Sequence, residues 1–219
     1  GASYIGTFHL LTPWHLRKDN ALSPFFYYFN IFIFNSLLLL GSISHFRAMT
    51  TDPGAVPEGS LPLPKDFLKF TKNKKNIKKC ERSGVYKPPR AHYDRGVSRQ
   101  VVKMDHHCPW VNNCIGINNQ KFFILFCMYV GLASFYILFI EIMYWINSCV
   151  HYSSNSSQLV TNVVSTINNN NTSQCGSIAP TSVIFLILLT VESVLFGLFT
   201  SCMFGDQIHS IASNKTYID

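Results

Sequence analysis

The sequence predicts an all-α multi-pass membrane protein with three transmembrane helices and a small, irregular cytosolic loop domain that contains cysteine and histidine. Two observations lead to this prediction. Three long apolar stretches each exceed the ~18 residues that a membrane span needs. In addition, 15 of the 18 Lys and Arg residues fall between the first stretch and the second. Composition alone is uninformative, because 47% hydrophobic and 13% charged residues lie close to the range of globular chains.

The three predicted spans are distinguished by their lack of charge. The first covers residues 25–46 and has no charged residue. The second covers 122–146 and is interrupted only by Glu141, and the third covers 181–204 with Glu192 as its one acid. Each is long enough to cross a hydrocarbon core of roughly 30 Å as a helix.

The basic residues predict the orientation of the chain. Segment 47–121 is rich in Lys and Arg and is therefore expected in the cytosol, whereas 147–180 has neither residue and is expected in a lumen. The C-terminal segment 205–219 is then cytosolic. Segment 1–24 is then lumenal or truncated, since Ser3–Leu11 resembles the end of an earlier apolar stretch.

The loops between the spans carry further signals. Thr51–Gly54 reads as a turn at which the chain leaves the bilayer. The lumenal loop has glycosylation sequons at Asn155, Asn170 and Asn171, and Cys149 and Cys175 are a possible disulfide there. The basic run Lys72–Lys79 is explained by topology and by attraction to an anionic leaflet, so a nucleic acid partner is not expected.

The segment Asp105-His106-His107-Cys108 holds the residues with catalytic potential. A thiol becomes a competent nucleophile when an imidazole takes its proton, and a carboxylate can hold that imidazole in the useful tautomer. In an extended backbone, residues i and i+2 point to the same side. His106 is therefore predicted to serve Cys108 as the base, with Asp105 as its orienting partner, while His107 faces away and pairs with Cys114 as a candidate for zinc.

At these residues the chain resembles the DHHC family of protein S-acyltransferases. The signature 105–108 is followed by the family's Pro109-Trp110, Asn112-Asn113-Cys114 and Gly116. Thr51–Gly54 resembles the family's Asp-Pro-Gly motif, and Thr216–Asp219 resembles its Thr-Thr-x-Glu motif with Asp for Glu. Three further segments are similar to the Golgi-type members: Arg47–Met49, Asn118–Lys121 and Met203–Gly205.

The resemblance implies a function and a location. Cys108 is expected to take an acyl group, usually palmitoyl, from acyl-coenzyme A and to pass it to cytosolic cysteines of membrane-associated proteins. The loop domain, about residues 78–121, then faces the cytosol at a Golgi or endoplasmic reticulum membrane. The family has four spans, so its first span and its C-terminal tail are expected to be absent from this chain.

The zinc ligands depart from the family pattern. The resemblance implies two zinc ions, held with the help of six cysteines that precede the signature, of which Cys80 alone remains. The candidate metal ligands are Cys80, His92, His107 and Cys114, two for each site and too few for a structural zinc site. Serine, tyrosine, glycine and arginine stand at or near expected ligand positions, namely Ser83, Tyr93, Gly96 and Arg99.

The incomplete zinc sites leave alternatives to an active acyltransferase. The chain is either an enzyme, a catalytically impaired relative that serves as a scaffold, or a damaged member of the family. A transporter or channel is a further class, which Glu141 and Glu192 within spans favour and the small number of spans disfavours. At most one weakly held zinc ion is expected.

Overall fold

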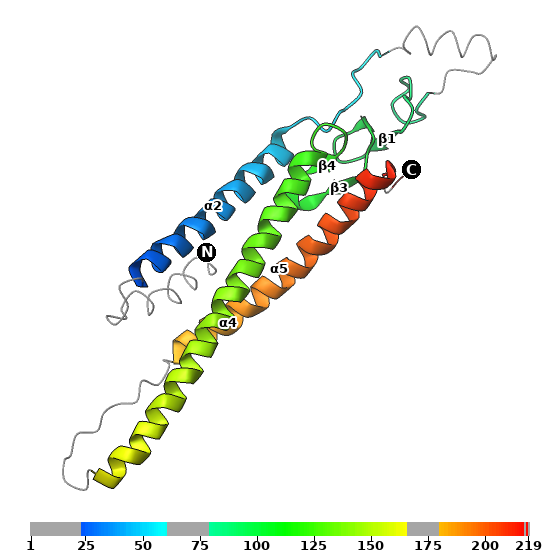
Figure 1. The fold of residues 1–219 in the computed structure, drawn as a ribbon. Coiled ribbons are helices and arrows are strands. Elements are labelled where there is room, and N and C mark those ends of the chain that lie inside the picture. Colours follow the sequence, from blue (N-terminus) through cyan, green and yellow to red (C-terminus); the bar gives the residue numbers. More distant parts are fainter. Residues whose placement is uncertain (1–22, 61–78, 166–179, 217, 219) are drawn as a thin grey trace. The chain divides into compact units, whose positions relative to one another are not determined.

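The computed structural model describes residues 23–60, 79–165, 180–216 and 218, and its main elements are three long helices and a group of short strands (Figure 1). The helices are α2 (Ser23–Thr50), α4 (Gln120–Ser165) and α5 (Pro180–Ser213). Among the described residues, three segments are long and apolar enough to cross a membrane: Phe25–Thr50, Gln120–Ile146 and Ile184–Ser213. The predicted class, a helical membrane protein, is confirmed.

The helices extend beyond the predicted spans for local reasons. Helix α4 continues to Ser165, into the segment predicted as a loop, because neither Pro nor Gly occurs between Asn147 and Ser165. Helix α5 ends in a Schellman motif, in which Lys215 N–H donates to the Ser210 carbonyl at 3.1 Å and Asn214 adopts a left-handed φ of 50°. The sequons at Asn170 and Asn171, together with Cys175 and Lys72–Lys78, lie outside the described residues.

The loop domain, predicted to be irregular, contains two small antiparallel sheets. Strands β1 (Ala91–Asp94) and β2 (Arg99–Val102) form the first, with Ala91 opposite Val102. The second joins β3 (His106–Cys108) to β4 (Asn113–Ile115) across the 3₁₀ helix η1 (Pro109–Val111). Strands of three or four residues are too short to show an alternating sequence pattern, which is why the sequence did not predict them.

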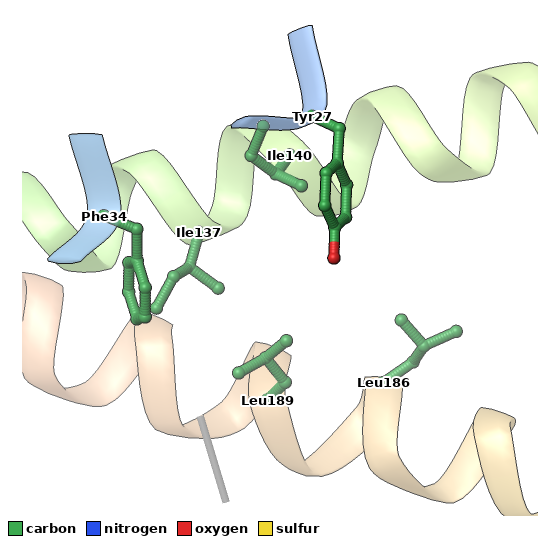
Figure 2. Close-up of a cluster of buried hydrophobic side chains, with 6 residues drawn as sticks. All are labelled: Tyr27, Phe34, Ile137, Ile140, Leu186 and Leu189. Carbon is green, nitrogen blue, oxygen red and sulfur yellow. The ribbon is translucent and has the colours of Figure 1, made fainter. Parts of the chain in front are cut away.

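The chain divides into two compact units, and the first contains residues up to Leu37 together with Gly131–Phe199. Its core is formed by side chains from all three helices (Figure 2): Tyr27, Phe34, Ile137, Ile140, Leu186 and Leu189. The outward faces are apolar and open, with Phe32 70% and Leu195 62% exposed, as expected for surfaces that contact lipid.

The second unit, Leu38–Val130 with Thr200–Asp219, contains the predicted site. Its main core cluster combines the end of α2, the η1 and β4 region and the start of α4: Ala48, Cys108, Val111, Ile115, Phe123 and Cys127. Met203 and Phe204 of α5 pack against this cluster. The signature cysteine is thus part of a hydrophobic core that the membrane helices help to form.

Two asparagines join the loop domain to α2 within this second unit. Asn113 Nδ2 lies 3.1, 3.1 and 3.0 Å from the carbonyl oxygens of Ala48, Met49 and Thr51. Asn119 Nδ2 donates to Ala48 O at 3.3 Å and to Cys114 O at 2.8 Å. Carbonyls at a helix C-terminus have no partner within the helix, so the side-chain amides satisfy groups that burial would otherwise leave unpaired.

Candidate active site

The β3–η1–β4 hairpin determines the directions in which the signature side chains point. Pro109 begins the 3₁₀ turn, and Asn112 ends it with a left-handed φ of 46°, a conformation that Asn tolerates well. In strand β3, His106 and Cys108 lie on one face and His107 on the other. Gly116 follows β4 at a point of close approach, because a Cβ there would lie 2.5 Å from Pro53 O.

His106 is bonded on one ring nitrogen and open on the other. Its Nδ1 donates to Asp105 Oδ2 at 2.8 Å, which leaves Nε2 as the acceptor of the neutral ring. Nε2 is buried and has no hydrogen-bond partner among the described residues. A buried nitrogen without a partner is unusual in a folded protein and is expected where proton transfer takes place.

Cys108 combines burial with an acidic thiol. Its side chain is 2% exposed. Burial alone raises the pKa of a thiol, but His106 and the backbone N–H groups of Val111 and Trp110 outweigh this effect and lower the pKa of Cys108. The site therefore favours the nucleophilic thiolate.

The charge on His106 complements this thiolate. Burial disfavours the imidazolium, but the hydrogen bond and negative charge of Asp105, together with Cys108, raise the pKa of His106 to about 9. A lowered thiol pKa beside a raised imidazole pKa favours a thiolate–imidazolium pair, the reactive form of cysteine nucleophiles.

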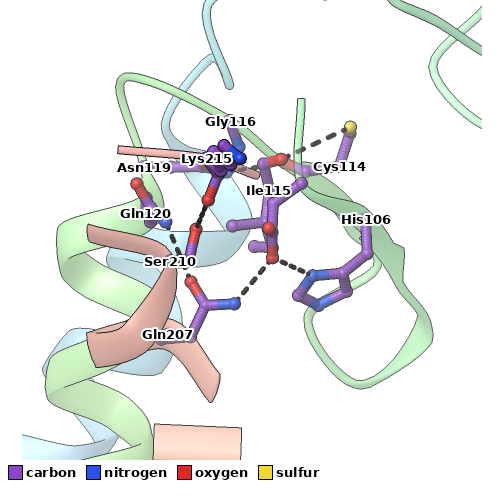
Figure 3. Close-up of polar contacts among 10 residues, drawn as sticks. His106, Cys114, Ile115, Gly116, Asn119, Gln120, Gln207, Ser210 and Lys215 are labelled. Carbon is purple, nitrogen blue, oxygen red and sulfur yellow. Dashed lines mark hydrogen bonds and ion pairs between the residues drawn. The ribbon is translucent and has the colours of Figure 1, made fainter. Parts of the chain in front are cut away.

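Asp105 is held by both backbone and side-chain bonds. It is 3% exposed, and its backbone N–H donates to Ile115 O at 2.8 Å. Besides His106, its Oδ2 accepts a hydrogen bond from Gln207 Nε2 at 2.6 Å (Figure 3). Gln207 belongs to α5 and was missed from the sequence, where its only signal is a polar residue near the end of an apolar helix.

A second contact from the end of α5 was also missed. Asn214, the left-handed residue that ends this helix, accepts a hydrogen bond from Arg90 Nη1 on Oδ1 at 3.1 Å and one from Arg90 Nη2 on its backbone oxygen at 2.9 Å. Lys103 Nζ lies 3.4 Å from the same Oδ1. Arg90 and Asn214 are 124 positions apart in the chain, so no local sequence pattern connects them.

A cavity of about 700 Å³ lies beside these groups, within the second unit. Asp105 and His106 form part of its wall, and the C-terminal part of the chain contributes Met203, Gln207, His209 and Lys215. Cys108 does not line it. The cavity therefore reaches the acid–base pair without exposing the thiol.

The four predicted metal ligands are not grouped as a zinc site among the residues that the structure describes. Among the described residues, no three His, Cys, Asp or Glu side chains are grouped so that they could hold a metal ion. Cys80 is buried in a turn and His92 lies in β1 opposite Val101, while His107 and Cys114 are opposite each other in β3 and β4. The second pair is thus brought together on neighbouring strands.

That second pair is engaged in other interactions. His107 Nδ1 donates to Asp94 Oδ2 at 2.9 Å, and the same oxygen accepts the Val97 N–H at 2.9 Å. Burial, with the negative charges of Asp94 and Asp105, raises the pKa of Cys114 to about 12. This pair supplies two of the four Cys and His ligands that a structural zinc site takes, and the described residues bring no third candidate ligand to it.

Comparisons with known proteins agree with the geometry of the site. A family model described as DHHC palmitoyltransferase matches residues 73–219. The human palmitoyltransferase ZDHHC3 is 42% identical over 221 residues, which is 100% of this chain and 64% of that protein. ZDHHC3-A of Danio rerio is 42% identical over 190 residues, 85% of this chain and 54% of its own length.

A more distant relative comes from a plant. The probable protein S-acyltransferase 12 of Arabidopsis thaliana is 32% identical over 196 residues, which cover 86% of this chain and 60% of that protein. The chain therefore spans between half and two thirds of the length of these relatives. The matched residues include the whole loop domain from Cys80 onward and both helices that follow it. On this evidence the chain belongs to the DHHC palmitoyltransferase family.

Proposed function

We propose that this protein is a protein S-acyltransferase. It moves a palmitoyl-type acyl group from acyl-coenzyme A, through a thioester on Cys108, to cysteines of membrane-associated proteins. The observation that carries the proposal is the arrangement of Asp105, His106 and Cys108 on one short hairpin. The buried Nε2 of His106 has no hydrogen-bond partner among the described residues and can accept a proton from a thiol. The named relatives support it, since they are called palmitoyltransferases or protein S-acyltransferases.

The first step forms the acyl-enzyme. The Cys108 thiol gives its proton to His106 Nε2, and the thiolate sulfur attacks the carbonyl carbon of the acyl-coenzyme A thioester. The bond between that carbon and the sulfur of coenzyme A breaks, and the leaving thiolate takes the proton back from His106. Asp105 stabilises the imidazolium between these two transfers.

The second step reverses the roles of the thiols. His106 Nε2 takes the proton of the substrate cysteine, whose sulfur attacks the acyl carbon on Cys108. The bond between the acyl carbon and Cys108 Sγ breaks, and His106 returns the proton to that sulfur. Each step exchanges one thioester for another, so no further reactant is needed.

The surroundings of Cys108 suit a lipid substrate. Ala48, Phe123 and Cys127 surround the thiol, and they belong to helices that qualify as membrane spans. Each buried CH₂ of an acyl chain contributes ~0.8 kcal/mol, so a long chain directed from the thiol along these helices is strongly held. The bilayer is then both the location of the enzyme and part of its acyl site.

The orientation and the compartment are also proposed. The basic residues of 47–121 favour a cytosolic loop domain, and the similarity to ZDHHC3 favours a Golgi membrane. Substrates would then be proteins that present cysteines at the cytosolic face. The positive loop would attract the phosphates of coenzyme A.

One experiment tests the reaction. Purified protein is incubated with palmitoyl-coenzyme A, and the Cys108 peptide is examined by mass spectrometry before and after hydroxylamine, which cleaves thioesters. A hydroxylamine-sensitive palmitoyl group on Cys108 in the wild type, absent from Cys108→Ser, is the expected result. Wild-type protein that forms no such thioester would refute the proposed reaction and leave a scaffold.

A further inference from the structure

A buried glutamine of α5 contacts the signature carboxylate. Gln207 lies near the end of the helix and is 3% exposed. Its Nε2 donates to Asp105 Oδ2 at 2.6 Å, although the two residues are 102 positions apart. Its Oε1 accepts a hydrogen bond from Gln120 Nε2 at 3.0 Å. Figure 3 shows Gln207 between Gln120 and His106, with dashed lines on both ends of its amide.

The chemistry of these groups permits one orientation of the Gln207 amide. An ionised carboxylate only accepts hydrogen bonds, so the Gln207 group that faces Asp105 is its NH₂. The amide oxygen then faces Gln120, which must donate. Gln120 is the first residue of α4, so the start of one helix and the end of another fix this amide from both sides.

The Gln207 contact also restrains the orientation of the His106 imidazole. Asp105 Oδ2 accepts both His106 Nδ1–H at 2.8 Å and the Gln207 amide, so the amide restrains the carboxylate that restrains the ring. A fixed ring keeps Nε2 directed at the sulfur that it must deprotonate. Without Gln207, the carboxylate loses one of the contacts that limit its rotation about its terminal bond.

We propose that Gln207 is a positioning residue for acyl transfer, which acts through Asp105, and that Gln120 sets the orientation of its amide. The inference rests on the proposed function and goes beyond it, because neither glutamine belongs to the signature. Gln207 contacts neither of the reacting sulfurs in this account. It is a positioning residue and not a catalytic one.

The main test is a kinetic double-mutant cycle. Gln207→Leu removes the donor and keeps the size of the side chain, and self-acylation should slow by roughly 10- to 100-fold, the loss expected for a hydrogen bond to a buried charge. The KM for palmitoyl-coenzyme A should stay within about twofold, because positioning acts on the chemical step. In an Asp105→Ala background, which removes the acceptor, the same change should cost about twofold or less, since the two effects pass through one contact.

A second variant changes the orientation of the amide from a distance. Gln120→Glu replaces the donor that faces Gln207 Oε1 with an acceptor, so the Gln207 NH₂ is drawn away from Asp105. Self-acylation should slow although Gln207 is intact. The control is Gln100→Leu, which removes another buried amide of the same unit, one that donates to Ser83 Oγ and Tyr86 O and not to Asp105. Gln100→Leu should change the rate of self-acylation by the same factor whether residue 105 is wild type or substituted.

A second readout separates this inference from the proposed function. The rate at which iodoacetamide labels Cys108 relative to Cys114, followed by mass spectrometry of the two peptides, reports thiolate reactivity without acyl-coenzyme A, because both thiols are buried and share any opening of the loop domain. Gln207→Leu should slow it, and Gln100→Leu should not. If the wild type forms no acyl-enzyme but the labelling still responds to Gln207→Leu, the acyltransferase is refuted and the positioning role stands. The positioning role would be overturned if Gln207→Leu had the same effect with and without Asp105→Ala, or if it left the labelling unchanged.

Discussion

Asp94 is predicted to stabilise the loop domain in the region where the family expectation puts a zinc ion. It is 4% exposed at the end of β1, and its Oδ2 accepts hydrogen bonds from His107 Nδ1 and Val97 N, each at 2.9 Å. The His107 ring packs over Gly96 so closely that a Cβ on this glycine would lie 2.2 Å from the ring Cε1. The ring occupies space that only glycine leaves free.

The cost of removing the Asp94 carboxylate follows from these contacts. Hydrogen bonds to charged groups contribute about 1.5–3 kcal/mol each. His107 is partly exposed and regains hydration, so Asp94→Ala should cost about 3 kcal/mol in total. Asp94→Asn keeps an acceptor and should cost about 1 kcal/mol.

Cys114 provides a local assay for this loss. It is 0% exposed and lies opposite His107 in the hairpin, so a maleimide reaches it only when the loop domain opens. A loss of about 3 kcal/mol raises the open fraction, and with it the labelling rate, about 100-fold. Glu81→Ala, which removes an exposed acid of the same domain, should change the rate less than about twofold and serves as the control.

A chelator distinguishes hydrogen bonds from metal. We expect EDTA to leave the labelling rate of Cys114 in the wild type unchanged, while Asp94→Ala raises it. The reasoning is refuted if EDTA exposes Cys114 and Asp94→Ala does not. In that case a metal ion would hold the hairpin, and the contact between Asp94 and His107 would have no structural role.

Four further predictions concern the chemistry, the scaffold and the topology. His106→Ala should slow self-acylation severely and Asp105→Asn less so; an undiminished rate in His106→Ala would contradict the assigned base. Because the pKa of Cys108 is lowered, its thiolate persists as pH falls toward 7. The rate of iodoacetamide labelling should therefore decline less steeply in the wild type than in His106→Ala, where the rate for an ordinary thiol falls about tenfold per pH unit below its pKa. Asn113→Ala removes the side-chain donor of Met49 O and Thr51 O, while Ala48 O keeps its bond from Asn119, and should destabilise the second unit by about 2 kcal/mol in thermal unfolding, which an unchanged melting curve would disprove. A tag inserted at Gly59 should be accessible to protease on the cytosolic side of sealed vesicles, and its protection would reverse the orientation.

The sequence was sufficient for the features that depend on nearby residues. The three spans were predictable because the apolar stretches are long and nearly uncharged. The association of Asp105, His106 and Cys108 was predictable because they are close in the chain. The strands and the helical extension to Ser165 were not, since three-residue strands show no period and a polar segment without Pro or Gly carries no stop signal.

The remaining contacts of the site depend on tertiary structure. They explain how a loop that lacks some of the family's zinc ligands can still hold Cys108 and His106 in place. Asn113 links the hairpin to the end of α2 through three carbonyls, and Gln207 links Asp105 to the end of α5. Rigid helices position a site more accurately than loops do, provided that their contacts reach the reacting groups. Here one of these contacts ends on the carboxylate that orients the base. The helix ends thus supply restraints on the acid–base pair from within one compact unit.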